Sequence, residues 1–157
     1  MSLTVRLAKR GDEHTLASLN AVAQTLHVQE RPADFKPPVE AEVVAWFEQW
    51  LEQGAVRIWI ADADSQPVGY AVAMMRHLPE SPFCPARLWC ELDQIAVVPE
   101  QRRRGAARAL VQAAIDYAAA EGVRELEATS WSFNETAHRM FEKLGFSKKT
   151  LRFKRPL

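Results

Sequence analysis

Hydrophobic and polar residues follow two different periods along this chain, and the periods divide it into strands and helices. Two-residue alternation or a run of β-branched residues indicates a strand, whereas apolar residues three or four positions apart indicate a helix. This order predicts an α/β (α+β) fold in which a mixed sheet carries helices on its faces. In chain order, we expect a strand at 3–8, helices at 12–26 and 39–53, strands at 56–63, 68–77 and 88–98, a helix at 104–121, a strand at 123–131, a helix at 134–144 and a strand at 146–155.

Polar residues and glycines mark the expected helix ends. Asp12 and Asn134 stand where an N-cap belongs, and Gly54, Gly122 and Gly145 follow the last residues of helical patterns. No repeat or low-complexity segment divides the chain. Its 157 residues are the usual size of one domain, so we expect a single domain spanning 1–157.

Composition excludes several classes of protein. With 48% hydrophobic and 25% charged residues, the chain is neither disordered nor collagen-like. No run approaches the ~18 apolar residues of a membrane span, so we expect no membrane partner. The first six residues lack the apolar core of a signal peptide, so we expect a cytoplasmic protein. Cys84 and Cys90 have neither a second cysteine pair nor a histidine cluster beside them, so we expect no metal and no disulfide.

The net charge of zero hides two oppositely charged parts. Residues 1–100 carry 8 basic and 14 acidic side chains, a net charge of −6, whereas residues 101–157 carry 12 basic and 6 acidic ones, a net charge of +6. Such a split fits an anion site in the C-terminal third and a cation site in the rest. An exposed basic tail would give the same numbers, so the split alone leaves both explanations open.

The segment from Asp93 to Leu110 carries the most specific chemistry. In it a strand ends, a short loop of arginines and glycine follows, and a long apolar helix begins at once. Amides at a helix start lack intrahelical partners and the helix dipole adds positive charge there, so this arrangement can bind a phosphate. Gly105 has no Cβ and lets a phosphate approach the main chain. The alternative is an ordinary helix start with solvated arginines.

Two sequence blocks resemble the GNAT superfamily of N-acetyltransferases. Arg102 to Ala107 matches the family's Arg/Gln-x-x-Gly-x-Gly/Ala signature, and Asn134 to Phe146 resembles its later Asn-x-x-Ala-x-x-x-Tyr-x-x-x-Gly-Phe block. The spacing of the two blocks and the order of the expected elements also match the family. The resemblance implies the GNAT fold, a mixed central sheet of six to seven strands that is splayed at the cofactor site, with about four helices on its faces.

The same resemblance implies acetyl-CoA as cosubstrate and no metal. In the family, acetyl-CoA lies where two parallel strands splay apart at a β-bulge, here the strands expected at 88–98 and 123–131. The pantetheine arm would pair with the first strand, and the pyrophosphate would lie on the amides of the following loop. Asn134 suits a plain N-cap role as well as a ligand contact. The implied cofactor-binding residues are Ile95, Ala96, Val97, Arg102, Arg103, Arg104, Gly105, Ala106, Ala107, Asn134 and Phe141.

The implied reaction is direct transfer of an acetyl group to an amine of a small molecule or peptide, so some group must accept a proton. Two-residue alternation places Glu91 and Asp93 on one strand face with Ile95 and Val97, which makes both carboxylates candidate general bases. A salt bridge or a polar rim is their alternative role. Where the family often has a tyrosine that protonates the leaving thiolate, this chain has Phe141, which cannot donate a proton.

The first two helices and their loop are expected to wall the acceptor site, with Trp131, His27 and Phe35 as candidate substrate residues. Trp131 follows the carboxyl end of a parallel strand, where ligands tend to bind. His27, just past the expected helix end, suits a C-terminal cap equally well. Trp46 and Trp50 also belong to the expected acceptor wall, but their spacing of four positions on an amphipathic helix favours a place in the core.

Some features of the sequence also suit functions other than acetyl transfer. Phe141 also suits a CoA-binding module without turnover, acting as a sensor or an assembly subunit. The arginine run and the basic tail suggest a nucleic-acid binder, but the neutral total charge and the strand-like alternation of the tail argue against that partner. The oligomeric state stays open, although members of the family often form homodimers through their C-terminal strands. The sequence does not identify the acceptor amine.

Overall fold

Five strands form one sheet in the spatial order β1-β2-β3-β4-β5 in the computed structural model, which describes residues 1–157. The first four strands pair antiparallel, whereas β5 lies parallel to β4, so the predicted hairpins and the predicted parallel pair are confirmed. The strands are β1 (Leu3–Leu7), β2 (Val56–Ala63), β3 (Gln66–Leu78), β4 (Arg87–Val97) and β5 (Leu126–Ala128).

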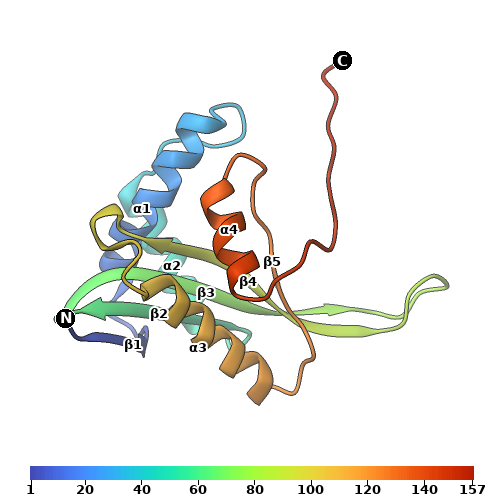
Figure 1. Cartoon of the computed structure of the whole chain (residues 1–157), viewed down its shortest axis with the longest axis horizontal. Helices are drawn as coiled ribbons and strands as arrows, with labels where there is room; N and C mark the ends of the chain where they lie inside the picture. Colours follow the sequence, from blue (N-terminus) through green and yellow to red (C-terminus); the bar gives the residue numbers. More distant parts are fainter.

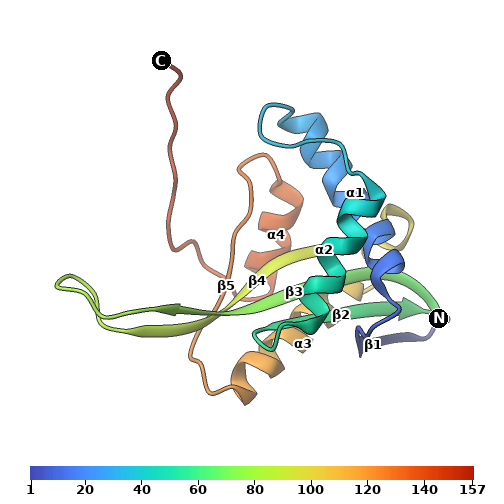
Figure 2. The same cartoon turned by 180° about the vertical axis from the view of Figure 1, so that it is seen from behind.

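Helices cover both faces of this sheet. They are α1 (Glu13–Glu30), α2 (Glu40–Glu52), α3 (Ala106–Ala120) and α4 (Glu135–Lys143), with a 3₁₀ turn, η1, at Pro99–Gln101. Figure 1 shows α1 and α3 on opposite sides of the sheet, and Figure 2 shows α2 alongside α1. The β3–β4 hairpin projects beyond the helices, and the chain after α4 runs away from the sheet (Figure 1). No helix is both long enough and apolar enough to cross a bilayer.

Each face of the sheet has its own apolar cluster. On one face, Leu110 of α3 packs with Ala71 and other small residues of the central strands. On the opposite face, Leu16 of α1 and Phe47 of α2 pack against Tyr70 and its β-branched neighbours. Because both faces are covered, β2 and the middle of β3 are buried at nearly every position and read as continuous hydrophobic runs. The two layers hold β4 in place for the site described below.

A β-bulge interrupts β4, as the family resemblance implied. Val72 pairs with Gln94, but the next residue of β3, Ala73, pairs with Leu92. Asp93 is therefore an extra residue with no partner of its own on β3. Such a residue bends its strand and loosens the local ladder, and here the bulge lies at the point where β4 loses its other neighbour.

The bulge also changes which side chains share a face of β4. Ile95 and Val97 pack with the α3-side cluster, whereas Glu91 lies opposite Met74 on the α1 and α2 side. The prediction that Glu91 and Asp93 share a face with Ile95 and Val97 is therefore wrong. One extra residue reverses the two-residue alternation, and periodicity in the sequence does not show where that residue will fall.

The sheet has five strands rather than the predicted six to seven, because the expected strand at 146–155 does not form. A strand needs a partner edge, and residues 147–157 are exposed with no sheet pairing. β5 is shorter than the predicted 123–131 because its parallel pairing with β4 ends after three residues. In contrast, α1 continues to Glu30, since no helix breaker precedes Pro32.

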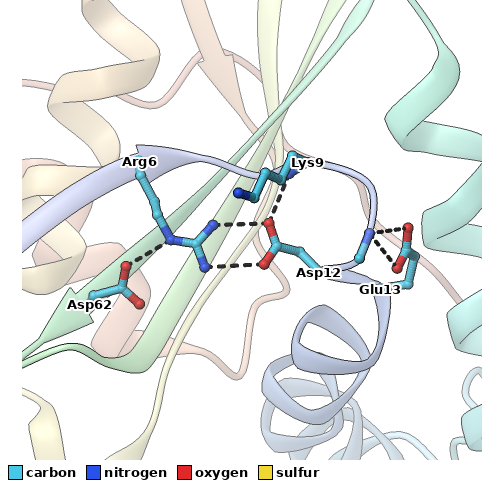
Figure 3. A network of polar contacts seen from close by, with 6 residues as sticks. Arg6, Lys9, Asp12, Glu13 and Asp62 are labelled. Atoms are coloured by element: carbon cyan, nitrogen blue, oxygen red, sulfur yellow. Dashed lines mark hydrogen bonds and ion pairs between the residues drawn. The ribbon is translucent and has the colours of Figure 1, made fainter.

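An ion-pair network holds the start of α1 against β1 and β2 (Figure 3). The guanidinium of Arg6 donates to both oxygens of Asp12, at 2.9 and 3.1 Å, and its Nε donates to Asp62 at 2.9 Å. The main-chain N–H of Lys9 also donates to Asp12, at 2.8 Å. Asp12 occupies the predicted N-cap position, but its carboxylate makes no capping hydrogen bond with α1. It is turned back toward β1 instead, where it joins the strand to the helix.

We expect Asp12→Asn to lower the free energy of unfolding at pH 7 by about 2 kcal/mol, because it removes a charged acceptor of several hydrogen bonds. Burial raises the pKa of Asp12, but the hydrogen bonds from Arg6 and from the Lys9 N–H outweigh it and hold the pKa below its ordinary value. A carboxyl group with a lowered folded pKa stabilises the fold above its unfolded pKa and loses that contribution as the pH falls through the folded pKa.

Urea unfolding at several pH values checks this expectation. The stability difference between Asp12→Asn and the natural chain should shrink as the pH falls below about 4, the unfolded pKa of an aspartate. Glu48→Gln is the control, since Glu48 is exposed on α2 and makes no ion pair or side-chain hydrogen bond. A difference that stays constant into acid would contradict the role of the carboxylate charge.

Candidate active site

A gap between β4 and β5 begins at the bulge. β5 pairs only with Cys90, Glu91 and Leu92 of β4 and then diverges, so its pairing stops immediately before Asp93. Beyond that residue, β4 keeps a partner on the β3 side alone. The edge of β4 beyond Asp93 therefore has no strand partner on the β5 side.

Ile95 and Val97 direct their main-chain groups into this gap. The N–H of Val98 donates to the carbonyl of Val68 on the β3 side, at 2.9 Å. In an antiparallel ladder, residues alternately bond to the partner strand and face away from it, so Ile95 and Val97 face away from β3. Ala96 bonds toward β3 by the same alternation, and its side chain packs against the cluster on the α1 and α2 side.

The main chain after β4 presents a run of amides that have no acceptor. No N–H between Arg103 and Arg108 donates to a main-chain or side-chain group, and no side chain caps α3. Arg103 and Gly105 have φ angles of 63° and 93°, and such left-handed turns form anion-binding nests of amides. Ala106 and Ala107 pack on the α3-side cluster and add little bulk. Together with the helix dipole, these amides make an electropositive cradle that suits an anion such as a phosphate.

Arg102, Arg103 and Arg104 surround this cradle and are exposed. The Nε of Arg102 donates to the carbonyl of Val97 at 3.2 Å, and Arg104 lies 3.4 Å from the side-chain oxygen of Gln101. None of the three arginines has a carboxylate partner within salt-bridge distance, although ion pairs are common elsewhere in the molecule. Their positive charge is therefore available to a phosphate.

The two candidate bases share one cation, Arg76 of β3. Its Nη2 lies 3.4 Å from Glu91 Oε1 and 3.6 Å from Asp93 Oδ1. The salt-bridge role that was open from the sequence is thus present for both carboxylates. Burial raises the pKa of Asp93 and the charge of Glu91 raises it further, against smaller opposing effects of Arg76 and of a hydrogen bond from Gln94. Asp93 therefore binds a proton more readily than an ordinary aspartate.

An uncharged hydrogen-bonded network lies next to the bulge and was not predicted from the sequence. Asn20 of α1 donates to the hydroxyl of Tyr70 at 2.9 Å, and that hydroxyl donates to Gln94 Oε1 at 2.7 Å. Tyr70 is fully buried, and burial raises its pKa far above the ordinary value, so the hydroxyl stays protonated. The only sequence signal was a tyrosine within a hydrophobic strand. The network fixes α1 against β4 beside Asp93.

The structure brings the three candidate substrate residues together. The ring of Phe35, from the α1–α2 loop, lies 4.8 Å from that of His27 on α1 and 5.0 Å from that of Trp131, which follows β5. Phe133, which the sequence analysis did not single out, completes the cluster 5.7 Å from His27. The guanidinium of Arg31 lies 5.4 Å from the centroid of Trp131. Such a cluster can contact an apolar or cationic part of a ligand.

Two predicted placements in this region need correction. His27 lies within the last turn of α1 rather than beyond it, and its Nδ1 is 2.6 Å from the carbonyl of Ala23. Trp46 is 54% exposed rather than part of the core, while Trp50 is half-buried. The buried stripe of α2 is centred on Phe47, so the helix turns Trp46 toward solvent.

The chain after β5 supplies the other border of the gap. Asn134 Oδ1 accepts from the N–H of Ala137 at 3.2 Å, so its predicted N-cap role is confirmed. Phe141 packs against Phe146 with ring centroids 5.2 Å apart. Ser130, two residues beyond β5, has a buried hydroxyl without a hydrogen-bond partner, which is uncommon in folded proteins.

Relatives of this chain include a curated acetyltransferase. An L-2,4-diaminobutyric acid acetyltransferase of Nocardia farcinica is 37% identical over 82 residues. The match covers 52% of this chain and 39% of that protein, so this chain spans about two fifths of the length of the relative.

Solved structures share the fold over nearly the whole chain. A tetramutant of the BH1408 protein from Bacillus halodurans has a TM-score of 0.90 at 23% identity, covering 98% of this chain and 99% of that one. The aminoglycoside N-acetyltransferase AAC(6')-Iy in complex with CoA has a TM-score of 0.77 at 23% identity, covering 99% and 95%.

The sequence model of one family matches residues 20–146, a range that begins within α1 and includes the bulge in β4, the cradle and α4. This range covers most of the chain and contains both sequence blocks on which the resemblance rested. The chain belongs to the acetyltransferase (GNAT) family.

Proposed function

We propose that this acetyltransferase moves an acetyl group from acetyl-CoA directly to a primary amine of a small molecule or peptide. The observation that carries the proposal is the run of unpartnered amides from Arg103 to Arg108, directly beyond a parallel strand pair that stops at a bulge. The free strand edge suits an extended arm, and the cradle suits a diphosphate. Relatives named for L-2,4-diaminobutyric acid and for aminoglycosides also act on small amines.

The residues of the gap and the cradle fit acetyl-CoA. The main chain of Ile95 and Val97 would pair with the pantetheine arm, and Arg102 would have to release the carbonyl of Val97 for that pairing. The exposed arginines would neutralise the phosphates, and Ser130 would gain a hydrogen-bond partner. When bound, acetyl-CoA supplies the acetyl group as a thioester.

Asp93 is the proposed general base. A primary amine is protonated near neutral pH and must lose a proton to become a nucleophile. That first proton leaves to solvent, and Asp93 accepts a second proton from the nitrogen as the nitrogen–carbon bond forms and the carbon–sulfur bond breaks. The departing thiolate takes its proton from solvent, because Phe141 has none to give. A thiol with a pKa near ~8.5 leaves without a protein acid.

Acetyl-CoA and CoA are each expected to raise the melting temperature of the protein by about 5–10 °C at ~100-fold excess over Kd. A panel of small amines, incubated with acetyl-CoA and the protein, is expected to release free CoA thiol for at least one member. If neither compound stabilises the protein, the cosubstrate assignment is wrong.

A CoA-binding module without turnover is the second candidate. The observation that favours it is the phenylalanine at position 141, which packs on Phe146 and offers no proton donor to the gap. Such a module would be stabilised by acetyl-CoA in the same way. It would release no thiol with any amine of the panel, and that result would replace the enzymatic proposal.

A further inference from the structure

A cavity of about 380 Å³ lies beside the bulge, between α1, the α1–α2 loop and α2. Gln94 is the one lining residue from β4 and marks the inner, sheet-side wall; Asp93 is next to it in the chain but does not itself line the cavity. Asn20 and Gln24 of α1 add two further amide side chains. A ligand in this cavity therefore meets uncharged hydrogen-bonding groups next to the proposed base, and cavities of this size are typical of small-molecule sites.

The same cavity is lined by one cation and one anion. Lys36 Nζ lies 2.6 Å from Glu42 Oε2, and their side chains are 75% and 60% exposed. The main chain of Lys36 is fixed at this position, because Gln24 Nε2 donates to its carbonyl at 2.8 Å. An exposed ion pair adds little to stability, so a ligand that offers both charges can separate the two side chains at little cost.

We propose that this cavity binds the acceptor, and that the acceptor is a small diamino acid. Its carboxylate would pair with Lys36, its α-ammonium group with Glu42, and its distal amine would lie at the inner wall by Gln94 and Asp93. This assignment rests on the acetyl transfer proposed above and adds the chemical class of the acceptor. A diamine without a carboxylate would leave Lys36 facing a cation without compensation, so the cavity discriminates against it.

Equilibrium binding without acetyl-CoA tests the assignment. The probes are 2,4-diaminobutyrate and ornithine, each compared with its decarboxylated counterpart, 1,3-diaminopropane or 1,4-diaminobutane, by calorimetry. The natural chain is expected to bind each amino acid about 10-fold more tightly than the matched diamine, the effect of one charge-assisted contact. Lys36→Ala should remove this preference by weakening only the amino acids.

Matched variants separate this role from general charge effects. Lys154→Ala removes an exposed lysine of the C-terminal tail, and Glu48→Gln removes an exposed carboxylate of α2 outside the cavity lining. Both should leave all four affinities unchanged, whereas Glu42→Gln should weaken the amino acids. The inference is overturned if the natural chain shows no preference for a carboxylate, or if the preference survives in Lys36→Ala.

Binding and turnover distinguish a failure of this inference from a failure of the proposed function. Thiol release with simple diamines, and no preference for the amino acids, would leave acetyl transfer standing and overturn the cavity assignment. Selective binding of the amino acids, with no thiol release from any amine, would support the cavity as a diamino acid site and overturn acetyl transfer. If acetyl transfer and the cavity assignment both hold, Lys36→Ala should raise KM for the amino acids and leave kcat nearly unchanged.

Discussion

Asp93→Asn is expected to lower kcat for acetyl transfer by about 10²–10⁴-fold, the usual contribution of a general base. Asparagine has nearly the same shape as aspartate but cannot accept the proton of the amine. The affinity for acetyl-CoA should stay close to that of the natural chain, because the cradle begins several residues later, at Arg103. Steady-state thiol release gives kcat, and calorimetry gives the affinity.

The direction in which kcat changes with pH also tests Asp93 as the general base. Asp93 works as a base only when it is deprotonated, so activity should rise as the pH increases through its pKa. Burial and the charge of Glu91 raise that pKa, so the acid limb should lie above the ~3.9 of an ordinary aspartate. Asp93→Asn should abolish this limb as well as lower the rate.

Two variants should move the acid limb in opposite directions. Glu91→Gln removes a charge that raises the pKa of Asp93, so the limb should shift to lower pH with most of kcat retained. Arg76→Gln removes a cation that lowers this pKa, so the limb should shift to higher pH. If Glu91→Gln loses activity while Asp93→Asn keeps it, the roles of the two carboxylates are reversed.

Local pattern was enough to predict the elements with strong periodicity. The bounds of β2 agree with the predicted 56–63, and α3 starts within two residues of the expected position. A short run rich in β-branched residues favours a strand, and a broad apolar stripe with a period near 3.6 favours a helix. The cradle could also be predicted from the sequence, because its chemistry depends on residues that are adjacent in the chain, from Arg102 to Ala107.

Features that depend on pairing between distant segments could not be predicted from local sequence pattern. The faces of Glu91 and Ile95 are set by where the ladder between β3 and β4 slips, a property of two strands together. The polar network of Asn20, Tyr70 and Gln94 joins three separate segments. The expected strand at 146–155 has suitable alternation, yet alternation does not decide whether a segment pairs, and no strand of the sheet pairs with it.

The charge split of the sequence acquires a more definite meaning in the structure. Among the basic residues of the C-terminal third, Arg139 and Lys149 pair with carboxylates. The arginines at positions 102–104 do not, and they surround the cradle. The positive excess is therefore uncompensated where a diphosphate would bind. Lys148, Arg152, Lys154 and Arg155 of the exposed tail also have no carboxylate partner, so the positive excess comprises both this cradle and a solvated basic tail.

Gly105→Ala is expected to weaken acetyl-CoA binding by about 10²-fold. A Cβ at this position would lie 3.7 Å from Leu3 and would not clash with the protein. The φ of 93° is the obstacle, because a left-handed conformation costs other residues about 1–2 kcal/mol. Alanine would relax this turn and rotate the amides that the cradle aims at the phosphates, each worth about 1.5–3 kcal/mol toward a charged group. Calorimetric titration with acetyl-CoA measures the loss.

Gly122→Ala provides the matched control at the opposite end of the same helix. Gly122 also has a positive φ, 74°, and open space around the Cβ position. Both variants should therefore lose a similar amount of stability, about 1–2 kcal/mol, while only Gly105→Ala should lose affinity for acetyl-CoA. Equal stability losses with unchanged affinity in both variants would show that the amides at the start of α3 do not hold the phosphates. Because both variants carry similar backbone strain, a difference in their affinities for acetyl-CoA measures the effect of position 105 on the cradle.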